Sequence, residues 1–139
     1  MLRQLFMSRP QQAAIITHLQ TCFPQEGCGF LAGTCVEGIG QVSVVYPMVN
    51  VLASPTAYAM EPAAMVKTLL EIERLGFTLL AIYHSHPYSA AVPSAQDVTL
   101  ANYPEAAYLI ISLLDGTRPQ SKAYLIREQQ VQPIPLNIL

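Results

Sequence analysis

The hydrophobic pattern divides the chain into short segments that follow either a helix period or a strand period. Apolar residues recur at helical spacing after Ser8–Gln11, which combines a serine N-cap, a proline in the first turn and a glutamine at the capping-box position. We therefore predict a helix from about Arg9 to Cys22, ended by Pro24. A second helix is predicted to begin at Glu61 and to end at Gly76, a natural C-cap.

Extended segments account for most of the remaining chain. The predicted strands are Leu2–Met7, Phe30–Gly33, Val42–Val51 with an interruption at Pro47, Ala57–Met60, Phe77–His84, Ala107–Leu113, Ser121–Arg127 and Val131–Leu136. A turn is expected at Val36–Gly40 and a short third helix at Ser94–Ala101. This order predicts an α/β (α+β) sandwich, with one mixed β-sheet flanked by helices, in a single domain over residues 1–139.

Composition narrows the classes of function. The 139 residues are 52% hydrophobic and 12% charged, with a net charge of −2 and no basic run. This balance gives no electrostatic basis for nucleic-acid binding, and no apolar stretch reaches the length needed to span a bilayer. Cys22, Cys28 and Cys35 are odd in number and lack C-x-x-C spacing, and we recognise no signal peptide. We therefore expect a cytoplasmic protein with reduced thiols.

The residues that carry chemistry gather in one stretch, Tyr83–Asp97, with the sequence YHSHPYSAAVPSAQD. It follows the apolar run Phe77–Tyr83, which predicts a buried strand. Side chains two apart on an extended segment point the same way, so His84 and His86 can present their imidazoles to one point. Asp97, brought back by the loop, can add a carboxylate. Two imidazoles and a carboxylate with one open position are the composition of a catalytic zinc site.

A hydrolytic zinc site needs more than its ligands. Zinc on this ligand set would lower the pKa of a bound water to about 7. A base must still take the proton of that water and pass it to the leaving amine. Glu26, at a helix-to-strand junction, is the candidate for this base. Ser94, three residues before Asp97, is the candidate donor to the oxyanion of the tetrahedral intermediate.

Each of these residues also has an ordinary structural interpretation. Ser94 and Asp97 stand at the positions of a helix N-terminal capping box, which is compatible with a serine hydroxyl that points at a site. Glu26 taken alone is a surface acid, and an isolated H-x-H pair occurs by chance at strand ends. His18 lies between the apolar rows of its helix and is predicted to face solvent without a functional role. The combination of H-x-H-P, a loop and S-x-x-D after an apolar strand, with a glutamate upstream, favours the metal site.

The arrangement resembles the JAMM (MPN-plus) metalloproteases. Their signature is an upstream glutamate followed by H-[ST]-H-P, six residues and S-x-x-D. Here these are Glu26, His84–Pro87 and Ser94–Asp97, with Tyr88–Pro93 as the six residues between. The segments EGCGFLAG and YPEAAYLIIS are similar to the small bacterial branch, so the resemblance extends over nearly the whole chain.

The resemblance implies the MPN fold, a mixed sheet flanked by helices that is similar to the cytidine deaminase fold. It also implies zinc on His84, His86 and Asp97, Glu26 as general acid and base, and Ser94 as the residue that stabilises the oxyanion. Iron or cobalt could occupy the same ligands. The serine between the two histidines belongs to the motif but receives no chemical role.

The substrate class follows from the same resemblance. Relatives that cut ubiquitin chains carry two insertions that grip the substrate, whereas here Val45–Met60 is short and Asn102–Glu105 runs straight into the next strand. The small bacterial relatives resemble hydrolases that act behind the Gly-Gly tail of ubiquitin-like sulfur-carrier proteins. We therefore expect a zinc-dependent hydrolase of a peptide or isopeptide bond after such a tail, which releases an amino acid from the carrier.

Two alternatives stay open. One is a peptidase on short or cell-wall peptides, and the other is a non-catalytic MPN-type binding module. Ser85 argues against the second, because RadC-type proteins usually have asparagine there. A deaminase is excluded, since the chain has no H-x-E and no P-C-x-x-C. The apolar tail Pro133–Leu139 leaves self-association as a homodimer open.

Overall fold

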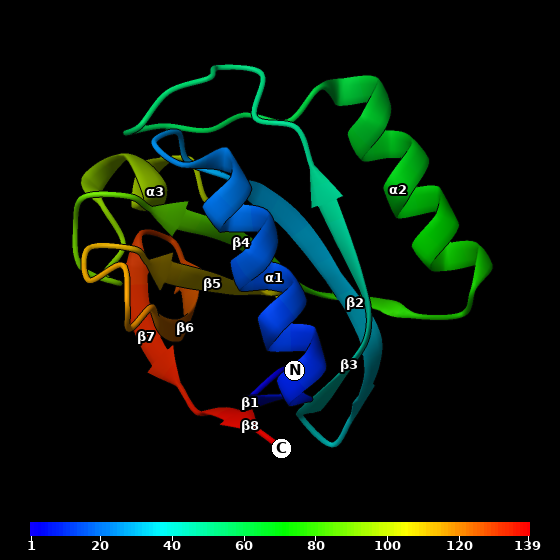
Figure 1. Ribbon diagram of the computed structural model, residues 1–139. Coiled ribbons are helices and arrows are strands. Elements are labelled where there is room, and N and C mark those ends of the chain that lie inside the picture. Colours follow the sequence, from blue (N-terminus) through cyan, green and yellow to red (C-terminus); the bar gives the residue numbers. More distant parts are fainter.

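The computed structural model describes the whole chain as one eight-stranded mixed sheet with three helices (Figure 1). The strands are β1 (Gln4–Met7), β2 (Cys28–Val36), β3 (Ile39–Met48), β4 (Thr78–His86), β5 (Ala107–Ser112), β6 (Gln120–Arg127), β7 (Gln130–Ile134) and β8 (Leu136–Ile138). The helices are α1 (Arg9–Cys22), α2 (Pro62–Arg74) and α3 (Ala95–Thr99). The strand order is β7-β6-β5-β4-β2-β3-β1-β8, which confirms the predicted mixed sheet. None of the helices combines the length and apolar character that a membrane crossing requires.

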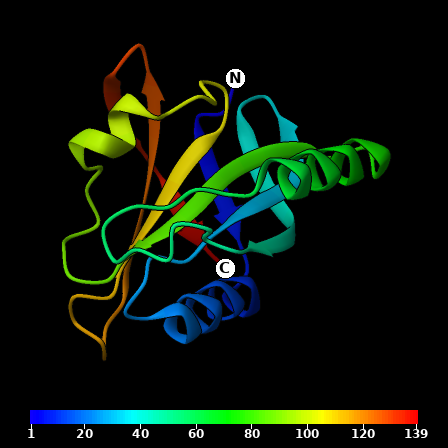
Figure 2. The ribbon, with the colours of Figure 1, turned by 90° about the horizontal axis from the view of Figure 1, so that it is seen from above.

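The helices cover opposite faces of the sheet, as Figure 2 shows. Helix α1 buries Ile15 and Leu19 in a cluster of 17 buried residues on one face. On the other face, Met65 of α2 and Val98 of α3 pack against a second cluster of 10 buried residues. We call these the α1 face and the α2/α3 face.

Strand β4 lies at the centre of the sheet and contributes to both faces. Its residues alternate, so that Ala81 and Tyr83 belong to the cluster on the α1 face, whereas Ile82 belongs to the cluster on the α2/α3 face. By the same alternation His84 and His86 share the α2/α3 face. The strand was predicted to end at His84, but it continues through His86, so both imidazoles stand on regular backbone.

The helix starts follow the local signals. Ser8 caps α1, and both hydrogen bonds of the capping box with Gln11 are present. Glu61 caps α2 through its carboxylate, which accepts from the amides of Ala63 and Ala64. Gly76 follows α2 with a φ of +73°, as its predicted capping role requires.

The predicted interruption of the third strand at Pro47 is wrong. Pro47 lies within β3 and pairs with Gly29 of β2. Strand β1, the other neighbour of β3, pairs with it only as far as Gln41. Beyond that residue one side of β3 is an edge, where a residue without an N–H is tolerated. The turn predicted over Val36–Gly40 covers fewer residues than expected, because β2 extends to Val36 and β3 begins at Ile39.

The predicted strand at Ala57–Met60 does not form. The segment stays irregular because the Asn50 side chain takes up its polar backbone groups: the amide Nδ2 donates to the carbonyl of Ala57, and the side-chain oxygen accepts from the amide of Ala59. A side chain that satisfies backbone groups competes with strand pairing. The short third helix is also shorter than predicted, Ala95–Thr99, with Ser94 as its N-cap.

The C-terminal tail forms two strands where one was predicted. The chain leaves β7 at Ile134, passes Pro135 and forms β8, which pairs in parallel with β1 at the opposite end of the sheet order. The side chains of Ile134, Leu136 and Ile138 pack in or against the cluster on the α1 face. Packing within the chain therefore accounts for these three apolar residues of the tail, whereas Leu139 is exposed.

Replacement of Gly29 tests how tightly β2 packs on β4. A methyl group at Gly29 would collide with the Tyr83 ring and the Tyr46 carbonyl oxygen, so Gly29→Ala should lower the free energy of unfolding by about 1–3 kcal/mol. Chemical denaturation measures this change. Gly116→Ala is the control, because no atom lies near its added Cβ. Equal stability of the two variants would contradict the packing described here.

Candidate metal centre

The pairing of β2 with β4 assembles the site. The two strands are antiparallel, with Cys28 opposite His84. One pair further along, the amide of Gly27 donates to Ser85 Oγ at 2.9 Å, and the amide of Ser85 donates to the Gly27 carbonyl at 3.0 Å. Continued by one more residue, this register sets Glu26 opposite His86. A glutamate 60 residues before the histidine thus reaches the same edge of the sheet.

The structure brings His84, His86 and Asp97 together. The two imidazole Nε2 atoms are 3.2 Å apart, and Asp97 Oδ2 lies 3.2 Å from His84 Nε2 and 3.0 Å from His86 Nε2. The side chains of His84, His86 and Asp97 are only 0%, 5% and 10% exposed, respectively. Three side chains from two elements therefore point their ligand atoms at one buried location.

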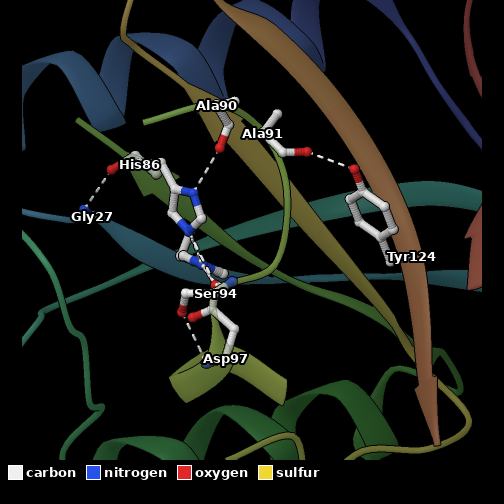
Figure 3. Close-up of polar contacts among 9 residues, drawn as sticks. Gly27, His86, Ala90, Ala91, Ser94, Asp97 and Tyr124 are labelled. Atoms are coloured by element: carbon white, nitrogen blue, oxygen red, sulfur yellow. Dashed lines mark hydrogen bonds and ion pairs between the residues drawn. The ribbon is translucent and has the colours of Figure 1, made fainter. Parts of the chain in front are cut away.

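Asp97 reaches this location because the loop after β4 is held at several points (Figure 3). The imidazole of His86 bonds through Nδ1 to the Ala90 carbonyl at 2.9 Å. The Tyr124 hydroxyl donates to the Ala91 carbonyl at 2.6 Å. Asp97 then stands in the first turn of α3, where its Oδ2 accepts from the amide of Ser94 and its own amide donates to Ser94 Oγ. The capping box expected for these two residues is present, and it orients the carboxylate toward the histidines.

The proton positions around this cluster fit a cation. A carbonyl only accepts, so the bond to Ala90 requires a hydrogen on His86 Nδ1. In the neutral ring, Nε2 then presents a lone pair to the carboxylate of Asp97 at 3.0 Å. Two facing lone pairs repel unless a proton or a metal ion lies between them. Tetrahedral ligands at about 2.0 Å from zinc lie about 3.3 Å from one another, close to the separations here. The donor set therefore fits zinc.

The charges of the three residues are strongly coupled. Burial raises the pKa of Asp97, but hydrogen bonds from the two imidazoles outweigh it and hold that pKa well below its usual range. Burial lowers the pKa of His84, and the nearby carboxylate only partly opposes this effect. The pKa of His86 is raised, because its bonds to Asp97 and Ala90 outweigh the effect of burial. The carboxylate is thus held ionised, ready for a cation.

Glu26 is a buried residue, so its interpretation as an ordinary surface acid is wrong. It is 4% exposed, and its Oε1 atom has no hydrogen-bond partner within the protein. Its backbone is fixed on both sides: its amide donates to the Ser54 carbonyl at 2.8 Å, and the Asn50 side chain donates to its carbonyl at 2.9 Å. Burial raises the pKa of Glu26 to about 7, with a lowering contribution from His86 and a raising one from Asp97. A carboxyl group with a pKa near neutrality can both accept and donate a proton.

Ser94 lies at the exposed rim of the site. Its hydroxyl oxygen accepts from the amide of Asp97 at 3.0 Å, which leaves the hydroxyl hydrogen free for another acceptor. The capping role and a donor role are therefore compatible, as expected from the sequence.

The sequence analysis assigned no role to two residues of the site, Ser85 and Tyr58. Ser85 is fully buried and faces away from the imidazoles, where it accepts the Gly27 amide and so ties the segment of Glu26 to β4. The alternation of side chains along β4 predicts this orientation, because Ser85 stands between two histidines that point to the other face. Tyr58 stacks on His84, with ring centroids 4.6 Å apart and an angle of 27° between the planes. It comes from the irregular segment before α2, which has no periodic pattern.

His18 does not face solvent as predicted. It is half-buried, with Nδ1 2.8 Å from the Tyr83 hydroxyl and Nε2 3.6 Å from Cys22 Sγ, and burial lowers its pKa. Tyr83 lies on the α1 face, so His18 supports β4 from the side opposite the candidate metal ligands.

Comparisons with known proteins agree with this architecture. The family model described as prokaryotic homologs of the JAB domain matches residues 8–129. The CysO-cysteine peptidase of Mycobacterium tuberculosis is 34% identical over 126 residues, 91% of this chain and 85% of its own length. The "Probable TtuB-protein conjugate cleaving protease" of Thermus thermophilus is 42% identical over 114 residues, 81% of this chain and 70% of its own. The solved structure of protein DSY2949 from Desulfitobacterium hafniense has a TM-score of 0.89 at 31% identity, and the alignment covers 97% and 92% of the two chains.

Removal of one candidate ligand tests the cluster. Asp97→Ala leaves two imidazoles, and we expect the zinc affinity to fall by more than about 100-fold. Competition with a chromophoric chelator measures the affinity. Glu105→Ala, which removes an exposed acid outside the cluster, should bind zinc as the unmodified chain does. Full zinc occupancy of Asp97→Ala would exclude the carboxylate from the ligand set.

Proposed function

The chain belongs to the family of prokaryotic homologs of the JAB domain, and on that premise we propose that it is a zinc-dependent hydrolase of carrier-protein conjugates. Its bond is the peptide or isopeptide bond that follows the C-terminal Gly-Gly of a ubiquitin-like or sulfur-carrier protein. The relatives in M. tuberculosis and T. thermophilus are named for CysO-cysteine and for TtuB–protein conjugates. The single observation that carries the proposal is the convergence of two imidazoles and a carboxylate beside a buried, unpartnered glutamate.

We assign the metal to His84, His86 and Asp97. Zinc, when bound, supplies a Lewis acid that lowers the pKa of a water molecule and polarises the scissile carbonyl. The bond from His86 Nδ1 to Ala90 supports this assignment, because it directs the other ring nitrogen toward the cluster. Iron or cobalt would suit the same ligands.

We assign the proton transfers to Glu26. Its carboxylate takes a proton from the attacking water and returns it to the nitrogen of the leaving group. The position opposite His86 and the pKa of about 7 support both halves of this role. Its backbone is held by Ser54 and Asn50, so little reorganisation is needed before the reaction.

Two serines assist in different ways. Ser94, at the rim, donates its hydroxyl hydrogen to the oxyanion that forms at the scissile carbonyl. Ser85 touches neither substrate nor metal ligand atoms in this scheme. It is a positioning residue, because its bond to Gly27 holds the next residue, Glu26, against β4.

We further propose that residues 1–139 act as a single domain and that the protein works in the cytoplasm. Support for the second point comes from Cys22, Cys28 and Cys35, which are all free thiols, as expected in a reducing compartment.

A sulfur-carrier protein extended by one cysteine after its Gly-Gly end tests the proposal. We expect the zinc-loaded protein to remove the cysteine and a chelator to stop the reaction. Glu26→Ala should lower the rate by more than about 100-fold yet keep one equivalent of zinc, because a base is removed and no ligand is. Intact mass follows the carrier, and metal analysis follows the zinc. Loss of zinc from Glu26→Ala would contradict the assignment of Glu26 as a base that is not a metal ligand. An uncleaved carrier with zinc bound to the protein would overturn the carrier proposal.

A second test separates positioning from direct chemistry. Ser85→Ala removes the acceptor for the Gly27 amide, so Glu26 loses its fixed place, and we expect kcat to fall about 10- to 100-fold with KM and zinc content unchanged. Ser85→Thr keeps the hydroxyl and should restore most of the rate. Steady-state kinetics on the same carrier substrate measure both variants. An unchanged kcat for Ser85→Ala would remove the positioning role.

A further inference from the structure

The loop between β3 and α2, residues 49–61, touches both halves of the candidate site. It crosses the edge of the sheet at which β4 ends (Figure 1), and its Tyr58 ring stacks on the imidazole of His84. Its Ser54 carbonyl accepts from the amide of Glu26 at 2.8 Å. We call this segment the β3–α2 loop. It contacts a candidate metal ligand through a side chain and the candidate base through its backbone.

Asn50 closes this loop with every hydrogen-bonding position of its side chain. Its Oδ1 accepts from the amides of Leu52 and Ala59, both at 3.1 Å. Its Nδ2 donates to the carbonyls of Glu26 at 2.9 Å and of Ala57 at 3.0 Å. The two donor hydrogens and two acceptor lone pairs of a primary amide are then all used, and the reverse placement would set oxygen against both carbonyls. The orientation of this side chain is therefore fixed.

Glu26 depends on this loop for the hydrogen bonds of its own backbone. It precedes β2, which begins at Cys28, so its amide and carbonyl lie outside the pairing of the strands. The amide donates to Ser54 and the carbonyl accepts from Asn50, and both partners belong to the β3–α2 loop. The place of the Glu26 carboxylate is therefore set by the loop as well as by β4.

We propose that Asn50 is a positioning residue that holds Glu26 and Tyr58 in a fixed relation across the candidate site, and this inference rests on the proposed function. One amide group bonds the carbonyl of the base and the carbonyl of Ala57, the neighbour of the tyrosine that stacks on His84. Asn50 touches neither the substrate nor the metal ligands in this scheme. It acts through Glu26, because a base must lie within hydrogen-bond reach of the water that it deprotonates.

Steady-state kinetics on the sulfur carrier extended by cysteine test this role. Asn50→Ala removes all four bonds, and we expect the zinc-loaded variant to lose about 10- to 100-fold in kcat with KM changed less than about threefold, because the base is displaced while the substrate still binds. Asn50→Asp keeps the two acceptor bonds and loses both donor bonds, so its kcat should fall as well. Asn137→Ala is the matched control: Asn137 donates to Gln4 and Leu5 at the β1–β8 end of the sheet, and its loss should leave kcat unchanged.

A double-variant comparison separates positioning from a general loss of structure. If Asn50 acts through Glu26, adding Asn50→Ala to Glu26→Ala should lower the residual rate less than about twofold. A change that merely loosens the fold would lower the rate by the same factor whether or not the glutamate is present. Metal analysis should find one equivalent of zinc in each variant, because no candidate ligand is removed.

Amide hydrogen exchange measured by NMR follows the loop without any turnover. The amide of Glu26, which is bonded to Ser54, should exchange at least about tenfold faster in both Asn50 variants. The amide of Ala59 should exchange faster only in Asn50→Ala, because the aspartate variant keeps the oxygen that accepts from it. Amides in the centre of β4 should exchange as in the unmodified chain, which confirms that each variant is folded.

The outcomes separate this role from the proposed function. An unchanged kcat in Asn50→Ala, an equal loss of rate with and without Glu26, or unchanged exchange of the Glu26 amide would overturn the positioning role and leave the hydrolase standing. No hydrolysis of the carrier by the unmodified, zinc-loaded protein would overturn the proposed function, and the role of Asn50 in catalysis with it.

Discussion

The register between β2 and β4 is the constraint on which the site depends. Cys28 pairs with His84, and the same register carries Glu26 to His86. Side chains alternate between the faces of a sheet, so a slip of one residue would turn the glutamate or the imidazoles to the opposite face. The close contact of Gly29 with the Tyr83 ring and the two hydrogen bonds between Gly27 and Ser85 hold the strands against such a slip.

The site keeps several titratable groups out of water, and this arrangement is unfavourable without a compensating charge. Asp97 and His86 satisfy each other in part, whereas Glu26 Oε1 and His84 Nδ1 have no partner in the protein. Buried polar groups without partners destabilise a fold. Such strain is expected where a cation or a substrate completes the set, and it accounts for the concentration of perturbed pKa values at this edge of the sheet.

The candidate metal ligands and the residues that hold β4 in place lie on opposite faces of the sheet. The three candidate metal ligands lie on the α2/α3 face, together with Tyr58, which stacks on His84. The opposite face holds Ser85 and the pair of His18 and Tyr83, which bind β4 to the segments around it. The two histidines of β4 therefore have neighbours in the same strand, Tyr83 and Ser85, whose contacts on the other face fix the backbone. This division fixes the backbone of the candidate site from both faces of the sheet.

The sequence by itself determined what depends on local geometry and on a recognisable motif. Short-range hydrogen bonding explains the helix caps at Ser8 and Glu61. Periodicity explains the strands of the mixed sheet and the shared face of the two histidines, which are two residues apart. The tertiary structure decided what depends on pairing between distant segments. Pro47 lies at a sheet edge, and Ala57–Met60 is irregular. His18 faces inward, and Glu26 is buried opposite His86. The rings of Phe23 and Tyr88, 65 residues apart in the sequence, pack against each other. Local patterns encode dihedral preference and which side of an element is apolar, whereas contacts between elements arise only when the packed core selects one register.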